Sequence, residues 1–231
     1  MSKTPTSRHD GRSDSGADIW FLLDRSGSMS SIAGDVVRGF DTFFKQQRKQ
    51  GGDATVTIVQ FDSEEPHDVI VKAKPLAKVR SIADRFEPRG GTPLYDAIGL
   101  LLDRAERRAE RDGGDAADQL VVVLTDGMED ASTDWTQQKL FKRIAKLRSA
   151  GWTFVFLGAN QDSYEAGAGL SMAAGNVSNF RPDSGGTAAA YAGLSRTVGE
   201  WRGKARDERR RDVDDFWAGQ KEAEQVEDTI G

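Results

Sequence analysis

The chain has 231 residues, no cysteine and a net charge of −5 at pH 7, which suits one compact domain with an appendage, or at most two small domains, and excludes disulfide support. An acidic chain has no long-range attraction for nucleic acid or for an anionic membrane, so we expect cations and basic partners instead. No stretch approaches the ~18 apolar residues that span a bilayer, and no apolar run near residue 1 resembles a secretory signal, so we expect a soluble cytoplasmic protein.

The first part of the chain predicts a flexible leader, a buried strand and a helix. Residues 1 to 16 are rich in Ser, Asp, Arg and Gly and have almost nothing to bury, which is typical of a flexible segment. Residues 18 to 23 are apolar after the first position and the run ends abruptly at Asp24, as expected of a strand covered on both faces. Apolar residues then recur at helical spacing up to the Gly51 and Gly52 pair; they are Ile32, Val36, Val37, Phe40, Phe43 and Phe44.

The middle of the chain predicts a hairpin and a second helix. Residues 54 to 61 and 68 to 74 are two short β-rich segments separated by a polar turn, and an antiparallel edge strand is their simplest placement. Thr92 and Pro93 predict the start of a helix, because Thr is a good N-cap and Pro suits the first helical position. This helix is expected to end near Gly113.

The remaining elements continue the alternation of strands and helices. Residues 119 to 125 predict a second buried strand that stops at Asp126, residues 152 to 157 a third, and residues 176 to 180 a short last one. Helices are predicted between and after them by apolar residues at helical spacing, which are Leu140, Ile144 and Leu147, and then Tyr191, Leu194, Val198 and Trp201. The domain is therefore predicted over residues 17 to 202, followed by a charged, helical tail over residues 203 to 231.

This alternation predicts an α/β fold with a mostly parallel sheet, one antiparallel edge strand and helices on both faces. In such sheets the ligand site lies at the carboxyl ends of the strands. Asp24 and Asp126 both follow buried strands, and Thr92 opens a helix. We therefore expect three segments far apart in the sequence to converge on one crevice.

The residues at this crevice suit a hard cation. Asp24, Ser26 and Ser28 place oxygen-bearing side chains at alternate positions, and Gly27 permits a tight turn between them. Mg²⁺ prefers oxygen ligands in octahedral geometry, whereas zinc and copper favour the nitrogen and sulfur of His and Cys, which are not near these positions. If Ser26, Ser28 and Thr92 are direct ligands, the ion keeps much of its charge and can accept an external carboxylate.

The motif resembles the metal-ion-dependent adhesion site (MIDAS) of von Willebrand factor type A domains. The matching positions are Asp24, Ser26, Ser28, Thr92 and Asp126, and the resemblance extends from about residue 17 to residue 201. It implies a Rossmann-like, doubly wound sheet and a bound Mg²⁺, with Mn²⁺ or Ca²⁺ as alternatives. In this family the three hydroxyls would be direct ligands in the ligand-bound state, and the two carboxylates would act largely through water.

The resemblance also implies a partner. An Asp or Glu of a partner protein would complete the coordination of the metal. Intracellular bacterial members of the family often work beside ring ATPases or within multi-protein assemblies, so the sequence favours a protein partner of this kind, in the cytoplasm, with neither nucleic acid nor membrane involved. The expected function is a metal-dependent binding module or adaptor with no catalytic residue, and not an enzyme.

Each residue taken alone also has an ordinary structural interpretation. The two serines and Thr92 suit turns or helix caps, and Asp126 with Gly127 is a common turn pair. Other acidic residues, Glu129, Asp130 and Asp134, are expected to favour the N-terminus of the helix that follows them more than to bind a cation. A solvated, internally paired helix is the expected form of the run Arg209, Arg210 and Arg211.

Two alternative functions remain open on the sequence. The first is a metal-dependent hydrolase, such as a phosphatase. A haloacid-dehalogenase-like phosphatase would need a second Asp where Ser26 stands, and a serine hydrolase built on Ser26 would need His9 or His67 as its base. The second alternative is a structural subunit in which the metal motif is present but unused.

Overall fold

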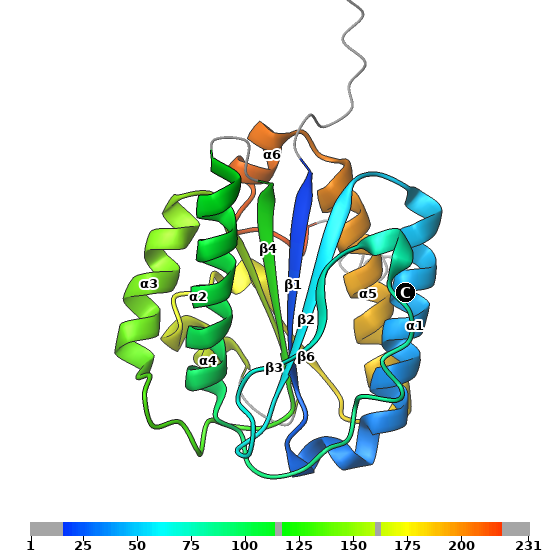
Figure 1. Ribbon diagram of the computed structural model, residues 1–231, viewed down its shortest axis with the longest axis vertical. Helices are drawn as coiled ribbons and strands as arrows, with labels where there is room; N and C mark the ends of the chain where they lie inside the picture. Colours follow the sequence, from blue (N-terminus) through cyan, green and yellow to red (C-terminus); the bar gives the residue numbers. More distant parts are fainter. Residues whose placement is uncertain (1–15, 114–116, 160–162, 219–231) are drawn as a thin grey trace, which may run out of the picture.

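The computed structural model describes residues 16 to 113, 117 to 159 and 163 to 218, which form a sheet between two layers of helices (Figure 1). The six strands lie in the order β3-β2-β1-β4-β5-β6. They are β1 (Ala17–Asp24), β2 (Ala54–Phe61), β3 (Asp68–Pro75), β4 (Asp118–Thr125), β5 (Thr153–Ala159) and β6 (Val177–Phe180). Every neighbouring pair is parallel except β2 and β3. The predicted mostly parallel, Rossmann-like sheet with one antiparallel edge strand is confirmed.

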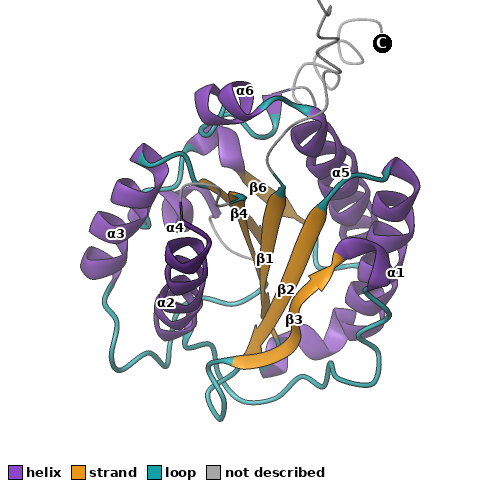
Figure 2. Cartoon of the chain, turned by 45° about the horizontal axis from the view of Figure 1, so that its top comes forward, coloured by secondary structure: helices purple, strands orange, loops and turns teal. Residues whose placement is uncertain are grey.

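Helices cover both faces of the sheet, as predicted (Figure 2). The helices α1 (Ala33–Gln50) and α5 (Ser184–Gly203) pack on one face, and α2 (Leu94–Asp112), α3 (Gln137–Ser149) and α4 (Ser163–Gly169) pack on the other. Successive residues of a strand point to opposite faces, so Phe21 belongs to the apolar cluster under α1, while Trp20 and Leu22 belong to the cluster under α2. In the described part of the chain, no helix is long and apolar enough to cross a membrane.

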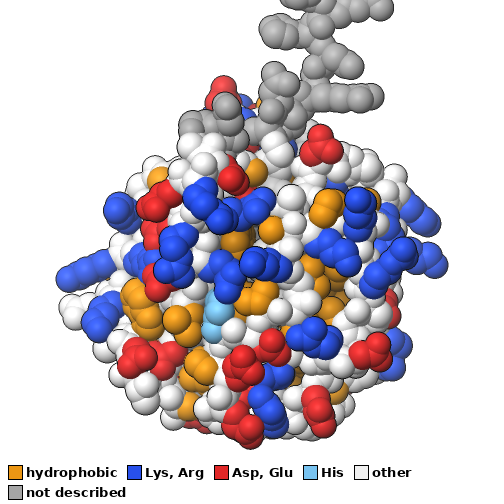
Figure 3. Space-filling view, viewed as in Figure 1, with side chains coloured by type: hydrophobic (Ala, Val, Ile, Leu, Met, Phe, Trp, Pro, Cys, Tyr) orange, Lys and Arg blue, Asp and Glu red, His pale blue; other side chains and the backbone are white. Residues whose placement is uncertain are grey.

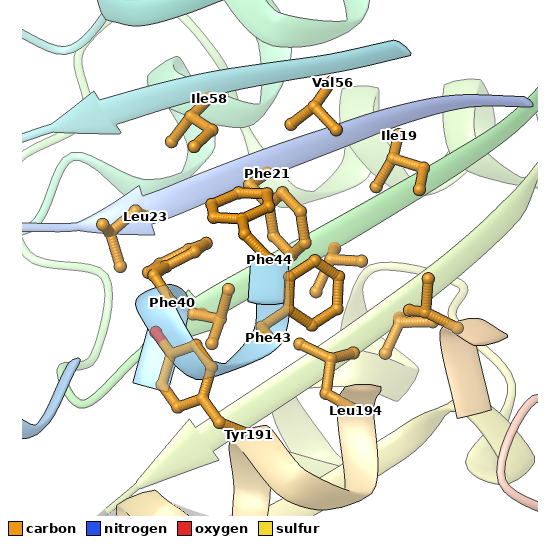
Figure 4. Packing of buried hydrophobic residues seen from close by; sticks show 14 of the residues in the cluster. Ile19, Phe21, Leu23, Phe40, Phe43, Phe44, Val56, Ile58, Tyr191 and Leu194 are labelled. Carbon is orange, nitrogen blue, oxygen red and sulfur yellow. The ribbon is translucent and has the colours of Figure 1, made fainter. Parts of the chain in front are cut away.

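Aromatic packing fixes α1 against the sheet and against α5. The ring of Phe21 on β1 meets Phe40 and Phe43 of α1 edge to face, with centroid distances of 5.2 and 5.3 Å. Phe40 also contacts Tyr191 of α5 at 5.2 Å (Figure 4). Edge-to-face pairs add directional contacts to the burial of apolar area. Strand β1 is therefore anchored to α1 through the ring of Phe21.

The predicted solvated form of the arginine run is wrong at Arg209, which lies in α6 (Arg206–Arg211). Its side chain is only 3% exposed, donates to Asp118 at the start of β4 at 2.9 Å, and covers the ring of Trp201 at 4.8 Å. Arg209 is buried because it pairs with the buried carboxylate of Asp118, which lies 91 positions away in the sequence. The local charge pattern around Arg209 does not reveal this contact. The division of the chain at residue 202 stays a prediction; residues 1 to 15 and 219 to 231 lie outside the described part.

Candidate metal site

The three predicted segments meet at the carboxyl end of the sheet. Asp24 is the last residue of β1, Asp126 follows β4 directly, and Thr92 stands two residues before α2. Strands β1 and β4 are parallel neighbours in register over their whole length, so their ends coincide. This is the lower end of the sheet in Figure 1, where the chain leaves β1 for α1.

All five predicted residues come together there. The hydroxyls of Ser26 and Ser28 are 3.0 Å apart, and Ser28 Oγ donates to Asp126 Oδ1 at 2.6 Å. Gly127 links the other two: a β-carbon at this glycine would lie 2.8 Å from Thr92 Oγ1 and 3.6 Å from Asp24 Oδ2. The site is therefore a compact set of three hydroxyls and two carboxylates drawn from three loops.

Backbone hydrogen bonds hold the first two loops together. Asp24 Oδ1 accepts from Ser26 N at 2.7 Å, which closes the turn after β1. Gly27 N donates to the carbonyl of Gly90 at 2.9 Å, and Gly90 has a φ of +65°, a conformation that favours glycine. These bonds fix the serine loop against the loop that carries Thr92.

Thr92 does not cap α2, contrary to prediction. The helix begins at Leu94 with Pro93 as its N-cap residue, and no side chain of that residue caps it. Its first amides are instead satisfied from the loop after β4: Tyr95 N donates to Glu129 Oε2 at 2.8 Å, and Asp96 N donates to Ser132 Oγ at 3.0 Å. Because the helix is capped from another segment, the hydroxyl of Thr92 is left to face the site.

Two of the acidic residues after β4, Glu129 and Asp130, contact the start of α2 and the residues just before it, and not the helix that follows them. Asp130 Oδ1 accepts from Thr92 N at 2.7 Å, and Asp130 N donates to the carbonyl of Thr92 at 3.3 Å. Asp96 in turn accepts from the backbone amides of residues 133 to 135. Sequence patterns gave no sign of these contacts, because each joins residues at least 34 positions apart.

The electrostatics of the site show a deficit of positive charge. Asp24 is fully buried, and its pKa is raised from 3.8 to about 6. Burial is the main cause, and the nearby charge of Asp126 adds to it. The hydrogen bonds that Asp24 accepts from Thr125 and Ser26 lower the pKa and offset only part of this rise. Burial also raises the pKa of Asp126. Arg25 does not neutralise the pair, because its guanidinium donates to Asp62 and to Asp68.

This arrangement fits a hard divalent cation. Two buried carboxylates and three hydroxyls supply only oxygen, which Mg²⁺, Mn²⁺ and Ca²⁺ accept as ligands. Within the described residues, no three His, Cys, Asp or Glu side chains form a cluster that could hold a metal ion. The groups that could hold a metal at this position are the hydroxyls of Ser26, Ser28 and Thr92 and the two carboxylates beside them.

The histidine that a serine hydrolase would require does not contact the serines. His67 lies between β2 and β3, and its Nε2 accepts from Arg104 Nε at 3.0 Å; among the described residues it has no hydrogen bond with Ser26 or Ser28. Burial, Arg104 and Arg107 lower its pKa to about 4. On the face of the molecule shown in Figure 3, basic side chains gather in a band across the middle. His9 lies outside the described residues.

His67→Gln should make the protein more tolerant of acid. A folded-state pKa below the unfolded value of 6.5 gives stability that is present above pH 6.5 and is lost as the pH falls toward 4. Because the His67 side chain is partly exposed, we expect the wild type to lose about 1 kcal/mol of its free energy of unfolding between pH 7.5 and pH 5, and His67→Gln to keep it. Urea unfolding of both proteins at pH 7.5 and pH 5 measures it, and an equal loss of stability in the two proteins would contradict the assignment.

Residues 19 to 129 match the family model of the von Willebrand factor type A domain. This chain contains a von Willebrand factor type A domain. The matched segment runs from β1 to the loop after β4 and includes the five residues of the predicted motif. No curated protein sequence matches the chain.

Solved structures show the same fold at low sequence identity. The pilus adhesin SpaC from Lactobacillus rhamnosus GG is 15% identical, with a TM-score of 0.62 over 80% of this chain and 30% of that one. Proximal thread matrix protein 1 from the mussel byssus, with a zinc-occupied MIDAS motif, is 17% identical, with a TM-score of 0.56 over 81% of this chain and 47% of that one. The chain thus spans less than half of either protein.

A third structure is covered more fully. The manganese-loaded TRAP protein of Plasmodium vivax is 15% identical, with a TM-score of 0.52 over 77% of this chain and 72% of that one. At identities of 15 to 17% these similarities establish the shared fold and nothing finer.

Proposed function

We propose that this von Willebrand factor type A domain binds a divalent metal and, through it, an Asp or Glu of a partner protein. The observation that carries the proposal is the pair of buried carboxylates, Asp24 and Asp126, beside three hydroxyls and with the adjacent Arg25 turned away. Mg²⁺ is the proposed ion, with Mn²⁺ or Ca²⁺ as alternatives. The zinc-occupied MIDAS motif of the mussel protein supports the choice of location, and the manganese-loaded TRAP protein supports metal binding by this fold.

The residues have different proposed roles. Ser26, Ser28 and Thr92 would bind the metal directly, and Asp24 and Asp126 would orient the hydroxyls and hold water on the metal. Neutral ligands leave most of the charge of the ion uncompensated, so the ion attracts a further anion. That anion is the carboxylate of the partner, for which a ring ATPase or a multi-protein assembly in the bacterial cytoplasm is the proposed source.

The geometry argues against a serine hydrolase with a histidine base. Hydrolysis needs a base within reach of the nucleophile, and His67 is bonded to Arg104, away from the serines. If the protein is a metal-dependent hydrolase instead, a panel of phosphoesters should be turned over with Mg²⁺, and the turnover should be lost in Asp24→Ala. If it is a structural subunit with an unused motif, calorimetry should detect no binding of Mg²⁺ or Mn²⁺.

The test of the proposal is partner capture under control of the metal. Immobilised protein is incubated with an extract of its source cells in MgCl₂ or in EDTA, and the bound proteins are identified by mass spectrometry. We expect a partner that is retained in MgCl₂, released by EDTA, and not captured by Asp24→Ala or Thr92→Ala. Equal capture by these variants, or capture unaffected by EDTA, contradicts the proposal.

Gly127→Ala should weaken metal binding with little effect on the fold. The added β-carbon would approach Thr92 Oγ1 to 2.8 Å, so the threonine hydroxyl must move away from the site. Displacement of one ligand is expected to raise the dissociation constant for Mg²⁺ by about tenfold, or about 1.4 kcal/mol. Calorimetric titration measures it; Gly34→Ala, on the exposed side of α1, is the matched control and should bind Mg²⁺ like the wild type.

A further inference from the structure

Thr125, the last residue of β4, makes three contacts that join two loops of the candidate site. Its Oγ1 donates to Asp24 Oδ2 at 2.6 Å and lies 3.1 Å from the carbonyl of Gly127, and it accepts from Gly127 N at 3.1 Å. The side chain is fully buried. The hydroxyl therefore lies between the carboxylate that ends β1 and the turn that carries Asp126.

The directions of these bonds define what the hydroxyl does. It has one proton, and the shorter distance gives that proton to Asp24 Oδ2, while its lone pair accepts from the amide of Gly127. The other oxygen of Asp24 is already held by Ser26 N at 2.7 Å. The carboxylate is thus oriented by two donors, one from its own loop and one from the neighbouring strand.

Thr is well suited to this position. A β-branched side chain in a strand has few rotamers, so the hydroxyl is held in place by the rigid centre of the sheet. Strand β4 is paired on both sides, with β1 and with β5. A contact from such a strand fixes the carboxylate of Asp24 more firmly than a contact from a loop would.

We propose that Thr125 is a positioning residue of the metal site, which sets the orientation of Asp24 and its distance from the turn of Asp126 and Gly127. The inference rests on the proposed metal-binding function. Thr125 does not itself touch the metal; it acts through Asp24 and through the backbone of Gly127. Removing an outer partner of this kind typically weakens metal binding by about 10-fold to 100-fold.

The chain offers a matched set of variants for the test. Thr125→Val removes the hydroxyl at nearly constant shape, Thr125→Ala removes it without adding a methyl group, and Thr125→Ser keeps it. Thr153 is the control, because it is also a buried strand threonine, 1% exposed, and its Oγ1 has no hydrogen-bond partner among the described residues. Thr153→Val therefore removes a buried hydroxyl that makes no comparable contact.

Each protein is titrated calorimetrically with MgCl₂ and with MnCl₂, and its free energy of unfolding is measured separately in EDTA. We expect Thr125→Val and Thr125→Ala to weaken metal binding by about 10-fold or more, Thr125→Ser to stay close to the wild type, and Thr153→Val to be unchanged. The unfolding measurement identifies a variant that has simply lost its fold; Thr125→Ala and Thr125→Ser then decide the result.

The outcomes separate the two proposals. If the wild type binds metal and both variants lacking the hydroxyl bind it equally well, Thr125 is only structural and this inference is overturned, while the proposed function stands. If Thr125→Ser is as weak as Thr125→Val, the hydroxyl is not the cause, and the inference is again overturned. If the wild type binds neither Mg²⁺ nor Mn²⁺, the proposed function itself fails.

Discussion

Thr92→Ala is expected to abolish the stabilisation of the protein by Mg²⁺. A ligand that binds only the folded state at 100 times its dissociation constant stabilises that state by about 2.7 kcal/mol. Thr92 Oγ1 faces the site beside Gly127, and the backbone of the same residue is held in place by Asp130. The substitution therefore removes one proposed ligand and leaves its supporting contacts intact. Chemical unfolding in MgCl₂ and in EDTA measures the difference.

The serine loop gives this experiment its matched control. Ser28→Ala removes the hydroxyl that donates to Asp126 and should lose the Mg²⁺ effect as Thr92→Ala does. Ser30→Ala removes an exposed hydroxyl from the same loop, one that donates to the carbonyl of Gly27 at 2.7 Å, and it should keep the full Mg²⁺ effect. A normal Mg²⁺ effect in both Thr92→Ala and Ser28→Ala would show that neither hydroxyl is a ligand.

Asp24→Asn is expected to stabilise the metal-free protein while removing metal binding. The folded-state pKa of Asp24 is raised from 3.8 to about 6, so the wild type loses stability as the pH rises from about 4 to about 6 and stays level above that. The loss corresponds to about 2 to 3 kcal/mol. The Asn side chain does not ionise, so in EDTA the variant should be more stable than the wild type at pH 7.5 and nearly equal to it at pH 4.

Mg²⁺ should reverse the order of stability, because it stabilises the wild type and not Asp24→Asn. Unfolding in urea from pH 4 to pH 8, with EDTA or with MgCl₂, measures both effects. Asp134→Asn, a substitution of an exposed Asp in the loop after β4, is the control and should follow the wild type throughout. If Asp24→Asn in EDTA shows the same pH dependence as the wild type, the buried carboxylate does not limit stability.

The sheet and the place of the site were predictable because their signals are local. Apolar runs that stop abruptly at Asp24 and at Asp126 mark the ends of buried strands, and the alternation of strands and helices makes those strands parallel. Parallel neighbours end at the same edge of a sheet, so the meeting of these two residues follows from the order of elements. Two of the five motif residues stand at such strand ends, the other three lie in the loops beside them, and the structure brings all five together.

The supporting contacts were decided by the tertiary structure alone. The N-cap preference of Thr92 is overridden because Glu129 and Ser132, from another loop, cap α2. Arg209, in a run that looks solvated, is buried because Asp118 and Trp201 lie beneath it. Thr125 reads as an ordinary strand residue until β1 places Asp24 beside it.

The sequence by itself determined which residues end the strands and which of them carry oxygen, since periodicity and turn residues act over a few positions. Only the tertiary structure decided how those oxygens are held. A hydrogen bond between Thr125 and Asp24 joins residues 101 positions apart, and its existence depends on which strands become neighbours and in what register. That information lies in the packing of the whole domain, and no local pattern contains it.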